Sequence, residues 1–322
     1  MYDSLSFCLT ASTAVKETET LEDWIGPWRA LTREKLTPVE LAVRGGFQAD
    51  RVAWAFLSGY QAALRSLLAS SAGLAAGPDE LLAFCATESG GNRPRDIATT
   101  FSGEGAALRV NGEKSWTALG SAATSLLVVG RQPSDGERPQ LRVACVPSTA
   151  EGVVFIEKPP MPYVPYAPEI VHTASRFDDV MPVRSTGGLA GGLLPGDGYG
   201  DYVKPFRSIE DTFVALAVQS WLLREARARS WPETYCEQLL TQLMVLCELA
   251  ESDLRSPVTH LVLAGALGAT GEAYLYADHL WGGEDDTAAE LWERDRPLFH
   301  VANKVRGLRA QRAWQALAAA GG

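Results

Sequence analysis

The stretch that decides the fold runs from Phe84 to Arg131 and reads FCATESGGNRPRDIATTFSGEGAALRVNGEKSWTALGSAATSLLVVGR. Short apolar or alternating runs recur along it, as strands require. Between two of these runs, Asn111-Gly112 predicts a hairpin turn, because both residues tolerate a positive φ. The stretch therefore predicts a set of antiparallel strands. The runs are 84–86, 98–101, 107–110 and 126–130.

Two side chains of this stretch suit the binding of a flat ring. Thr87 places a hydroxyl at the end of a predicted strand, and Trp116 places an indole just after the predicted hairpin. Such a pair can hold a heteroaromatic ring, with the indole on its face and the hydroxyl and backbone amides at its polar edge. The alternative is that Trp116 is an ordinary buried residue and that Thr87 has a partner within the fold.

Length and composition limit the class of protein. The 322 residues are enough for two domains or for one large layered domain. A content of 46% hydrophobic and 21% charged residues is ordinary for a globular protein with a sizeable core. No run of about 18 apolar residues occurs, so we expect no transmembrane helix. The first residues include Asp3 and lack an early Lys or Arg, which predicts a cytoplasmic protein without a signal peptide.

Charge and cysteine content exclude further classes. The net charge of −10 disfavours binding to nucleic acid, although a coenzyme A ligand needs only a few local cations. The five cysteines are scattered and contain no CxxC pair. We therefore expect neither a metal site nor a disulfide framework, and we expect the cysteines to be small buried residues.

Helices are predicted on both sides of the strand-rich region. Residues 1–18 look loose, whereas Thr37-Pro38-Val39-Glu40 is a capping box that predicts a helix start. Asp50 is expected to cap a longer helix with one apolar face. Four prolines predict an irregular connection late in the strand region, and a glycine-rich connector follows at 187–200. From Tyr202 onward long helices predict an antiparallel bundle, with a last helical region that starts at Asp286. The prolines are Pro159, Pro160, Pro162 and Pro165.

The order of these pieces resembles the acyl-CoA dehydrogenase family. Residues 84–88, FCATE, are similar to the first half of the family's Tyr-Cys-x-Thr-Glu-Pro-Gly-x-Gly-Ser-Asp loop. Residues 111–116, NGEKSW, are similar to its Asn-Gly-x-Lys-x-Trp-Ile-Thr motif. Residues 177–183 resemble the Phe-Asp-Asp-Val segment that closes the β-domain, and 192–199 resemble the linker that follows. The resemblance covers roughly residues 80–300.

The resemblance implies an α+β fold in three parts. They are a short N-terminal helical domain at 1–80, a middle β-barrel-like domain at 81–185 and a C-terminal four-helix bundle at 200–322. It also implies FAD as cofactor, with the pyrophosphate near the Gly-Gly pair that follows Trp281. The departures are Asn92-Arg93 in place of Gly-Ser in the loop, and Thr117 one place early with Ala118 behind it. The implied flavin-binding residues are Phe84, Ala86, Thr87, Trp116, Thr117, Gly282 and Gly283.

The usual catalytic carboxylate of the family is missing from its expected place. Most members use a Glu shortly after an Arg-Asp pair, which Arg294-Asp295 resembles. Counting on from that pair places Asn303 at the base position, and an amide cannot accept the proton. A minority of members carry the Glu just after the glycine-rich connector, where Glu210 lies. Glu210 is therefore the candidate base, and the alternative is a solvated carboxylate at a helix start, favoured by the helix dipole.

The arginines for the flavin pyrophosphate are also hard to find. The family's Arg-x-x-Phe motif has its nearest trace in Arg227 or Arg229, before Trp231. Surface cations on a helix explain both arginines equally well.

Three functions remain open. The first is an FAD-dependent oxidoreductase of fatty acid metabolism that oxidises the Cα–Cβ bond of an acyl-CoA or another acyl thioester, as a homodimer or homotetramer. The second is a degenerate, non-catalytic member that serves as a structural or partner subunit, including in a hetero-oligomer with a catalytic paralogue. Asn303 at the expected base position and Asn92-Arg93 in the loop favour this second function. The third is a flavin-dependent monooxygenase that uses His300, although a lone His in a helix is more often structural.

Overall fold

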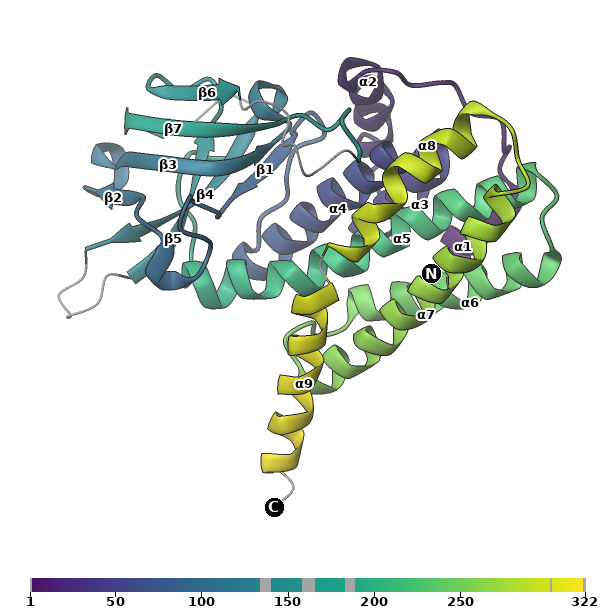
Figure 1. Cartoon of the computed structure of the whole chain (residues 1–322). Coiled ribbons are helices and arrows are strands. Elements are labelled where there is room, and N and C mark those ends of the chain that lie inside the picture. The colour runs from purple at the N-terminus through teal and green to yellow at the C-terminus, as the bar shows by residue number, and fades with distance from the viewer. Residues whose placement is uncertain (1, 134–139, 158–165, 183–188, 302, 321–322) are drawn as a thin grey trace. The chain divides into compact units, whose positions relative to one another are not determined.

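The computed structural model describes residues 2–133, 140–157, 166–182, 189–301 and 303–320 (Figure 1). Contacts divide the chain into two compact units, which we call the helical unit and the sheet unit. The helical unit contains residues 2–63, 166–169 and 208–320, and the sheet unit contains the described residues of 64–157 and 170–207. The three-part division predicted above follows the order of elements along the chain, and it stays a prediction.

The N-terminal helices begin at capping residues that the sequence signals. Thr20 accepts a hydrogen bond from the Asp23 amide, and the Asp23 carboxylate binds back to the Thr20 amide. Thr37 and Glu40 form the same reciprocal capping box, as predicted. These two boxes satisfy amides that a helix start otherwise leaves unpaired. The helices are α1 (Tyr2–Thr10), α2 (Leu21–Thr32), α3 (Pro38–Gln48) and α4 (Val52–Ala72).

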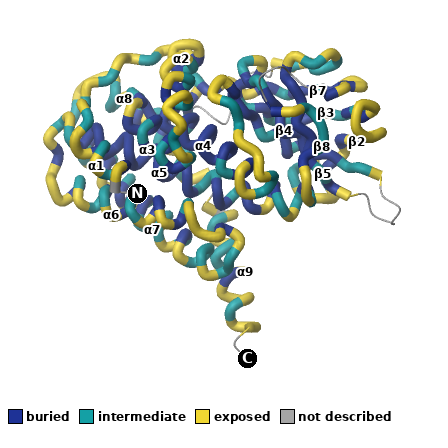
Figure 2. The backbone as a smooth tube through the Cα atoms, turned by 180° about the vertical axis from the view of Figure 1, so that it is seen from behind, coloured by how far each residue is buried: buried dark blue, intermediate teal, exposed yellow. Residues whose placement is uncertain are grey.

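The C-terminal helices pack on the N-terminal ones through a very close helix contact. A Cβ on Gly46 would meet the backbone of Ala217, and a Cβ on Gly59 would lie 2.6 Å from Phe213 O. Glycine is therefore required where α3 and α4 meet α5. Figure 2 shows this central region as buried, whereas α9 is exposed along most of its length. The helices are α5 (Lys204–Ala228), α6 (Glu233–Glu251), α7 (Pro257–Trp281), α8 (Thr287–Asp295) and α9 (Asn303–Ala320).

In the described part of the chain, eight strands form one sheet in the order β6-β7-β3-β2-β4-β5-β8, with β1 paired to β4. β1 and β2 run parallel to β4, and the other pairs are antiparallel. A buried apolar row on β4 and β5 makes the core of the unit. The strands are β1 (Leu82–Cys85), β2 (Thr100–Ser102), β3 (Arg109–Ala118), β4 (Ser125–Gln132), β5 (Gln140–Pro147), β6 (Val153–Glu157), β7 (His172–Val180) and β8 (Gly192–Leu193).

The predicted hairpin turn at Asn111-Gly112 is wrong. Both residues lie inside β3, and the chain reverses earlier, between β2 and β3. Gly112 has a φ of +141°, and the β3–β7 register shifts between Val110 and Gly112. The glycine therefore marks a β-bulge, a use of positive φ that the sequence does not distinguish from a turn.

Two predictions for the N-terminal part are also wrong. Residues 1–18 are not all loose, because Tyr2–Thr10 forms α1. Asp50 does not cap α4, because its carboxylate accepts hydrogen bonds from the Thr18 amide and from Arg51. The four prolines of the predicted connection lie outside the described residues, and so does part of the glycine-rich connector.

The predicted order of elements is confirmed: N-terminal helices, a middle sheet domain and C-terminal helices. Among the described residues, no helix combines the length and the hydropathy needed to cross a membrane. The same residues contain no cluster of His, Cys, Asp and Glu side chains arranged to hold a metal ion.

Candidate functional site

The two residues expected at a flavin ring lie side by side in the sheet unit. Thr87 follows the end of β1, and Trp116 lies in β3. The Ser115 backbone N–H donates to Thr87 O at 2.8 Å, so the two segments are joined next to these side chains. Ala86 is buried, whereas Thr87 and Trp116 are half-buried. The arrangement leaves an indole and a hydroxyl partly accessible on a fixed backbone.

A buried ion pair and several hydrogen bonds hold the backbone next to Thr87 in place. Lys114 Nζ lies 2.6 Å from Glu88 Oε1, and the Lys114 side chain is fully buried. The Glu88 carboxylate also accepts from the Ala98 amide at 2.6 Å and from the Thr99 amide and hydroxyl at 3.0 and 2.8 Å. Burial works to raise the pKa of Glu88, but Lys114 and these donors outweigh it and the pKa is lowered.

Thr117 has a different environment from the half-buried Trp116. It is fully buried, and its Oγ1 lies 2.7 Å from Ser175 Oγ and 3.5 Å from Cys85 Sγ. Thr117, directly after Trp116, therefore packs in the interior of the sheet unit.

The loop after β1 has an anchor that the family motif lacks. Arg207, in the first turn of α5, donates from Nη2 to Asn92 Oδ1 at 2.8 Å. The ring of Phe206 packs on that of Phe84, with centroids 4.7 Å apart. Asn92 stands where the family has Gly, so this departure supplies a new contact between the loop and α5. The sequence alone does not signal it, because 115 residues separate the partners.

Glu210 lies in the second turn of α5 and is half-buried. It is therefore not a residue of the helix start, which weakens the simple dipole explanation for its presence. Its neighbour Asp211 has a different environment, because Arg306 and Arg309 bind its carboxylate at 2.7 and 2.9 Å. Asp211 therefore joins α5 to α9.

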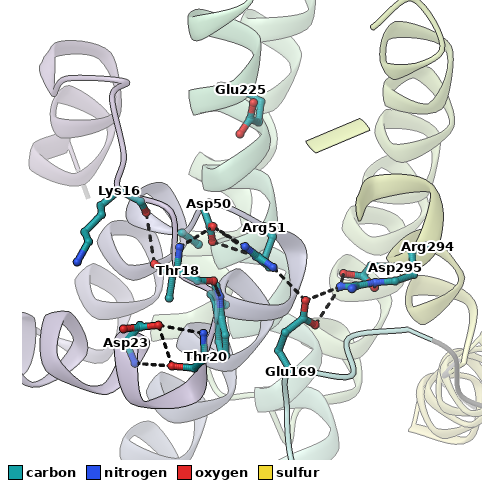
Figure 3. Close-up of polar contacts among 12 residues, drawn as sticks. Lys16, Thr18, Thr20, Asp23, Asp50, Arg51, Glu169, Glu225, Arg294 and Asp295 are labelled. Atoms are coloured by element: carbon teal, nitrogen blue, oxygen red, sulfur yellow. Dashed lines mark hydrogen bonds and ion pairs between the residues drawn. The ribbon is translucent and has the colours of Figure 1, made fainter. Parts of the chain in front are cut away.

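The Arg294-Asp295 pair belongs to a structural network of the helical unit (Figure 3). Arg294 binds Glu169 at 2.7 Å and Asp295 at 2.7 Å. Arg51 reaches the same Glu169 at 3.2 Å. Asp295 is fully buried and accepts from the Ala167 amide at 2.8 Å. Hydrogen bonding to Asp295 raises the pKa of Arg294, so this guanidinium stays charged.

The end of the chain offers no replacement base. Asn303 is the first residue of α9 and is exposed. Its Nδ2 lies 3.4 Å from Nδ1 of His300, which is also exposed.

No protein-family model and no curated protein sequence matches this chain. Solved structures do match it across nearly its whole length. An FAD-dependent dehydrogenase matches with a TM-score of 0.65 at 14% identity, over 98% of this chain and 96% of that one. The chain has the acyl-CoA dehydrogenase fold. An acyl-CoA dehydrogenase from Geobacillus kaustophilus matches with a TM-score of 0.62 at 15% identity, over 91% of this chain and 92% of that one. A glutaryl-CoA dehydrogenase from Mycobacterium smegmatis, solved with FADH2, matches with a TM-score of 0.60 at 14% identity, over 98% and 93%.

Within this acyl-CoA dehydrogenase fold, the residues fit the ring half of a flavin. Thr87 and Trp116 are half-buried, and the Glu88–Lys114 ion pair lies next to Thr87 in the chain. A planar ring with a polar edge suits this combination.

The residues expected at the pyrophosphate fit less well. Gly282 and Gly283 form an exposed turn after α7. Arg229 lies over the Trp281 ring at 4.4 Å and binds Glu225, Glu284 and Asp286 at 2.7 to 3.0 Å. Arg227 donates to the backbone of Cys8 and Ala11. These arginines already have protein partners.

Proposed function

We propose that this chain is a flavoprotein that oxidises the Cα–Cβ bond of an acyl thioester. The observation that carries the proposal is the Ser115–Thr87 hydrogen bond of 2.8 Å. It joins the backbone of Thr87 to the residue before Trp116, both Thr87 and Trp116 are half-buried, and the neighbouring Glu88 and Lys114 form a buried ion pair, which supports the proposal. The acyl-CoA dehydrogenase fold supports the reaction class.

The chain's residues have separate tasks in this proposal. Thr87 and the Ala86 and Thr87 amides bind the polar edge of the flavin, and Trp116 packs on its face and excludes water. Bound FAD supplies a hydride acceptor. Glu210 removes the α-proton of the thioester, because a half-buried carboxylate can act as a general base when substrate covers it.

The first test is the visible spectrum of the purified protein before and after addition of excess FAD and gel filtration. We expect flavin bands that stay with the protein. The second test is anaerobic addition of acyl-CoA esters of several chain lengths. Bleaching by one of them is expected in the wild type and in Glu237→Gln, an exposed control on α6. In Glu210→Gln the flavin bands should remain while bleaching slows by at least about a hundredfold.

A second candidate function rests on the exposed Asn303 and on the occupied Arg294-Asp295 pair. With these positions unavailable for chemistry, the chain can serve as a non-catalytic partner subunit. A protein that stays colourless after FAD addition but is folded favours this candidate over the first.

We also propose that the protein assembles with copies of itself through α7 and α9. α7 carries no Lys or Arg in 25 residues. Exposed apolar side chains lie on both helices, and such patches on a protein surface mark interaction sites. They include Val258, Val262, Leu275, Tyr276, Val305, Leu308 and Trp314. Light scattering should show a dimer or tetramer that a Leu275→Glu/Trp314→Glu variant dissociates. Leu9→Glu, an exposed position on α1, should leave it assembled.

A further inference from the structure

His172 lies directly opposite Ala118, two residues after Trp116. It is the first residue of β7, and its Cα partner across the strand pair is Ala118, the last residue of β3. Side chains of directly opposed residues on paired strands project to the same face. Ala118 stands where the family motif has a Thr, so this position has no hydroxyl of its own. The strand pairing instead brings the imidazole of His172 to this position.

The imidazole of His172 packs against the indole of Trp116. The two ring centroids lie 6.2 Å apart, and the ring planes are 80° from parallel. Aromatic rings make edge-to-face contacts at separations of about 4.5–7 Å, so the two rings are in direct contact. Both residues belong to the sheet unit. A ring that packs on this indole, as we propose for the flavin, therefore comes within reach of the imidazole.

The hydrogen bond that His172 makes engages only one of its ring nitrogens. Nδ1 lies 2.9 Å from the backbone oxygen of Ile170. A carbonyl oxygen only accepts, so Nδ1 carries the hydrogen of this bond. Nε2 is then an acceptor in the neutral ring and a donor in the protonated ring. Because the bond to Ile170 also orients the ring, less side-chain entropy is lost when a ligand binds to Nε2.

Nε2 of His172 is accessible to a ligand. His172 is exposed, and its Nε2 makes no hydrogen bond within the part of the chain that the structure describes. Further along the same strand, Arg176 and Asp178 bind each other at 2.9 Å. His172 therefore combines three features that a ligand-binding residue needs: an accessible polar atom, an oriented ring and contact with Trp116.

We propose that His172 is a further residue of the flavin site, and that its Nε2 hydrogen-bonds the polar edge of the flavin ring that packs on Trp116. That edge carries carbonyl oxygens, ring nitrogens and an N–H, so it offers a partner to the imidazole in either protonation state. The imidazole supplies the polar group that Ala118 lacks. This inference rests on the proposed function, because it requires FAD at Trp116.

The first experiment measures the Kd for FAD by quenching of flavin fluorescence on titration of the purified full chain, with circular dichroism to check the fold. His172→Phe keeps an aromatic ring beside Trp116 but loses Nε2, so the Kd should rise about three- to tenfold. His172→Gln restores a polar group and should bind FAD more tightly than His172→Phe. His260→Phe is the matched control. It removes an imidazole of the helical unit whose Nε2 lies 2.9 Å from Leu254 O, and the Kd should not change.

The second experiment follows the imidazole itself by NMR of the full chain, labelled with ¹⁵N at its 4 histidines. The Nε2 signal of His172 is identified because it is missing from His172→Phe. Addition of FAD should move this signal, since the chemical shift of a ring nitrogen responds to a hydrogen bond at that atom. The Nε2 signal of His260 should not move. This measurement needs no turnover.

The titration of the wild type separates the two ways in which the inference can fail. If the wild type binds FAD but both His172 variants bind it equally well, His172 does not contact the flavin, and the site at Thr87 and Trp116 stands. An Nε2 signal of His172 that does not move when FAD binds has the same meaning. If the wild type binds no FAD, the proposed function fails and this inference fails with it.

Discussion

Lys114 Nζ lies 2.6 Å from Glu88 Oε1 in the interior of the sheet unit, and the Lys114 side chain has no exposed surface. Lys114→Met should therefore destabilise the protein strongly, because it leaves the Glu88 charge buried without its cation. We expect a loss of about 3–5 kcal/mol in the free energy of unfolding. Urea denaturation followed by circular dichroism measures it. Lys204→Met, at an exposed position, should change stability by less than about 0.5 kcal/mol. A loss no larger than that control would show that the pair carries little stability.

The same pair predicts how stability depends on pH. The pKa of Glu88 is lowered in the folded state from its ordinary value of 4.5, with burial opposing and Lys114 and the hydrogen bonds outweighing it. The unfolded chain thus binds the proton more readily. The contribution of Glu88 is present above about pH 5 and is lost as the pH falls through the lowered folded pKa. The Glu88→Gln/Lys114→Met double variant should lose less stability than the wild type between about pH 5 and pH 3. Parallel losses in both proteins would refute the linkage.

In the helical unit, removal of the Glu169 charge should likewise lower the stability of the protein. Its carboxylate binds Arg51 at 3.2 Å and Arg294 at 2.7 Å. Glu169→Gln keeps the shape but removes the negative charge between two guanidinium groups, so we expect a loss of about 2–4 kcal/mol. Thermal and urea unfolding measure the change, and Glu157→Gln, an exposed strand carboxylate, is the control. If the variant is as stable as the control, the network is not what holds residues 166–169 to the helices.

Substitution of Gly112 should lower the free energy of unfolding, whereas substitution at a control position in a helix should raise it. A Cβ there would lie 2.6 Å from Thr99 Oγ1, and the φ of +141° is strained for any L side chain. Gly112→Ala should therefore cost about 2–4 kcal/mol. Thr241 lies at an exposed position inside α6, so Thr241→Ala should stabilise by about 0.5 kcal/mol. Denaturant unfolding of the two variants side by side compares them. Tolerance of Ala at position 112 would mean that the bulge can relax.

Local signals in the sequence predicted much of the fold. The capping box at Thr37 and the strand over residues 126–130 could be predicted because each depends on neighbouring residues. The predicted turn at Asn111-Gly112 failed because a turn and a bulge use the same residue types. Only the pairing of Asn111 with Thr100 of β2 and of Gly112 with Phe177 of β7 distinguishes the two.

Residues of the candidate site could be predicted from the sequence only where they belong to a motif. Thr87 and Trp116 follow from the motif, and the hydrogen bond that joins their segments agrees with it. The anchor between Asn92 and Arg207 could not be predicted, because its partners are far apart in the chain and neither is unusual alone. The network of Arg294 was missed for the same reason, since Glu169 lies 125 residues away.

Trp116 gives the most direct test of the flavin edge. Trp116→Ala removes the indole that is proposed to pack on the ring, and Thr117 remains buried with Ser175 to hold β3. We expect the Kd for FAD to rise by about tenfold or more, from loss of aromatic contact and of water exclusion. Trp116→Phe keeps a ring and should raise the Kd by less. Quenching of flavin fluorescence on titration measures both, and circular dichroism checks the fold. Leu9→Ala, an exposed residue of α1, is the control for loss of an apolar side chain elsewhere. If the wild type binds FAD and Trp116→Ala binds it equally well, the flavin does not lie on this indole and the site must be sought on other residues.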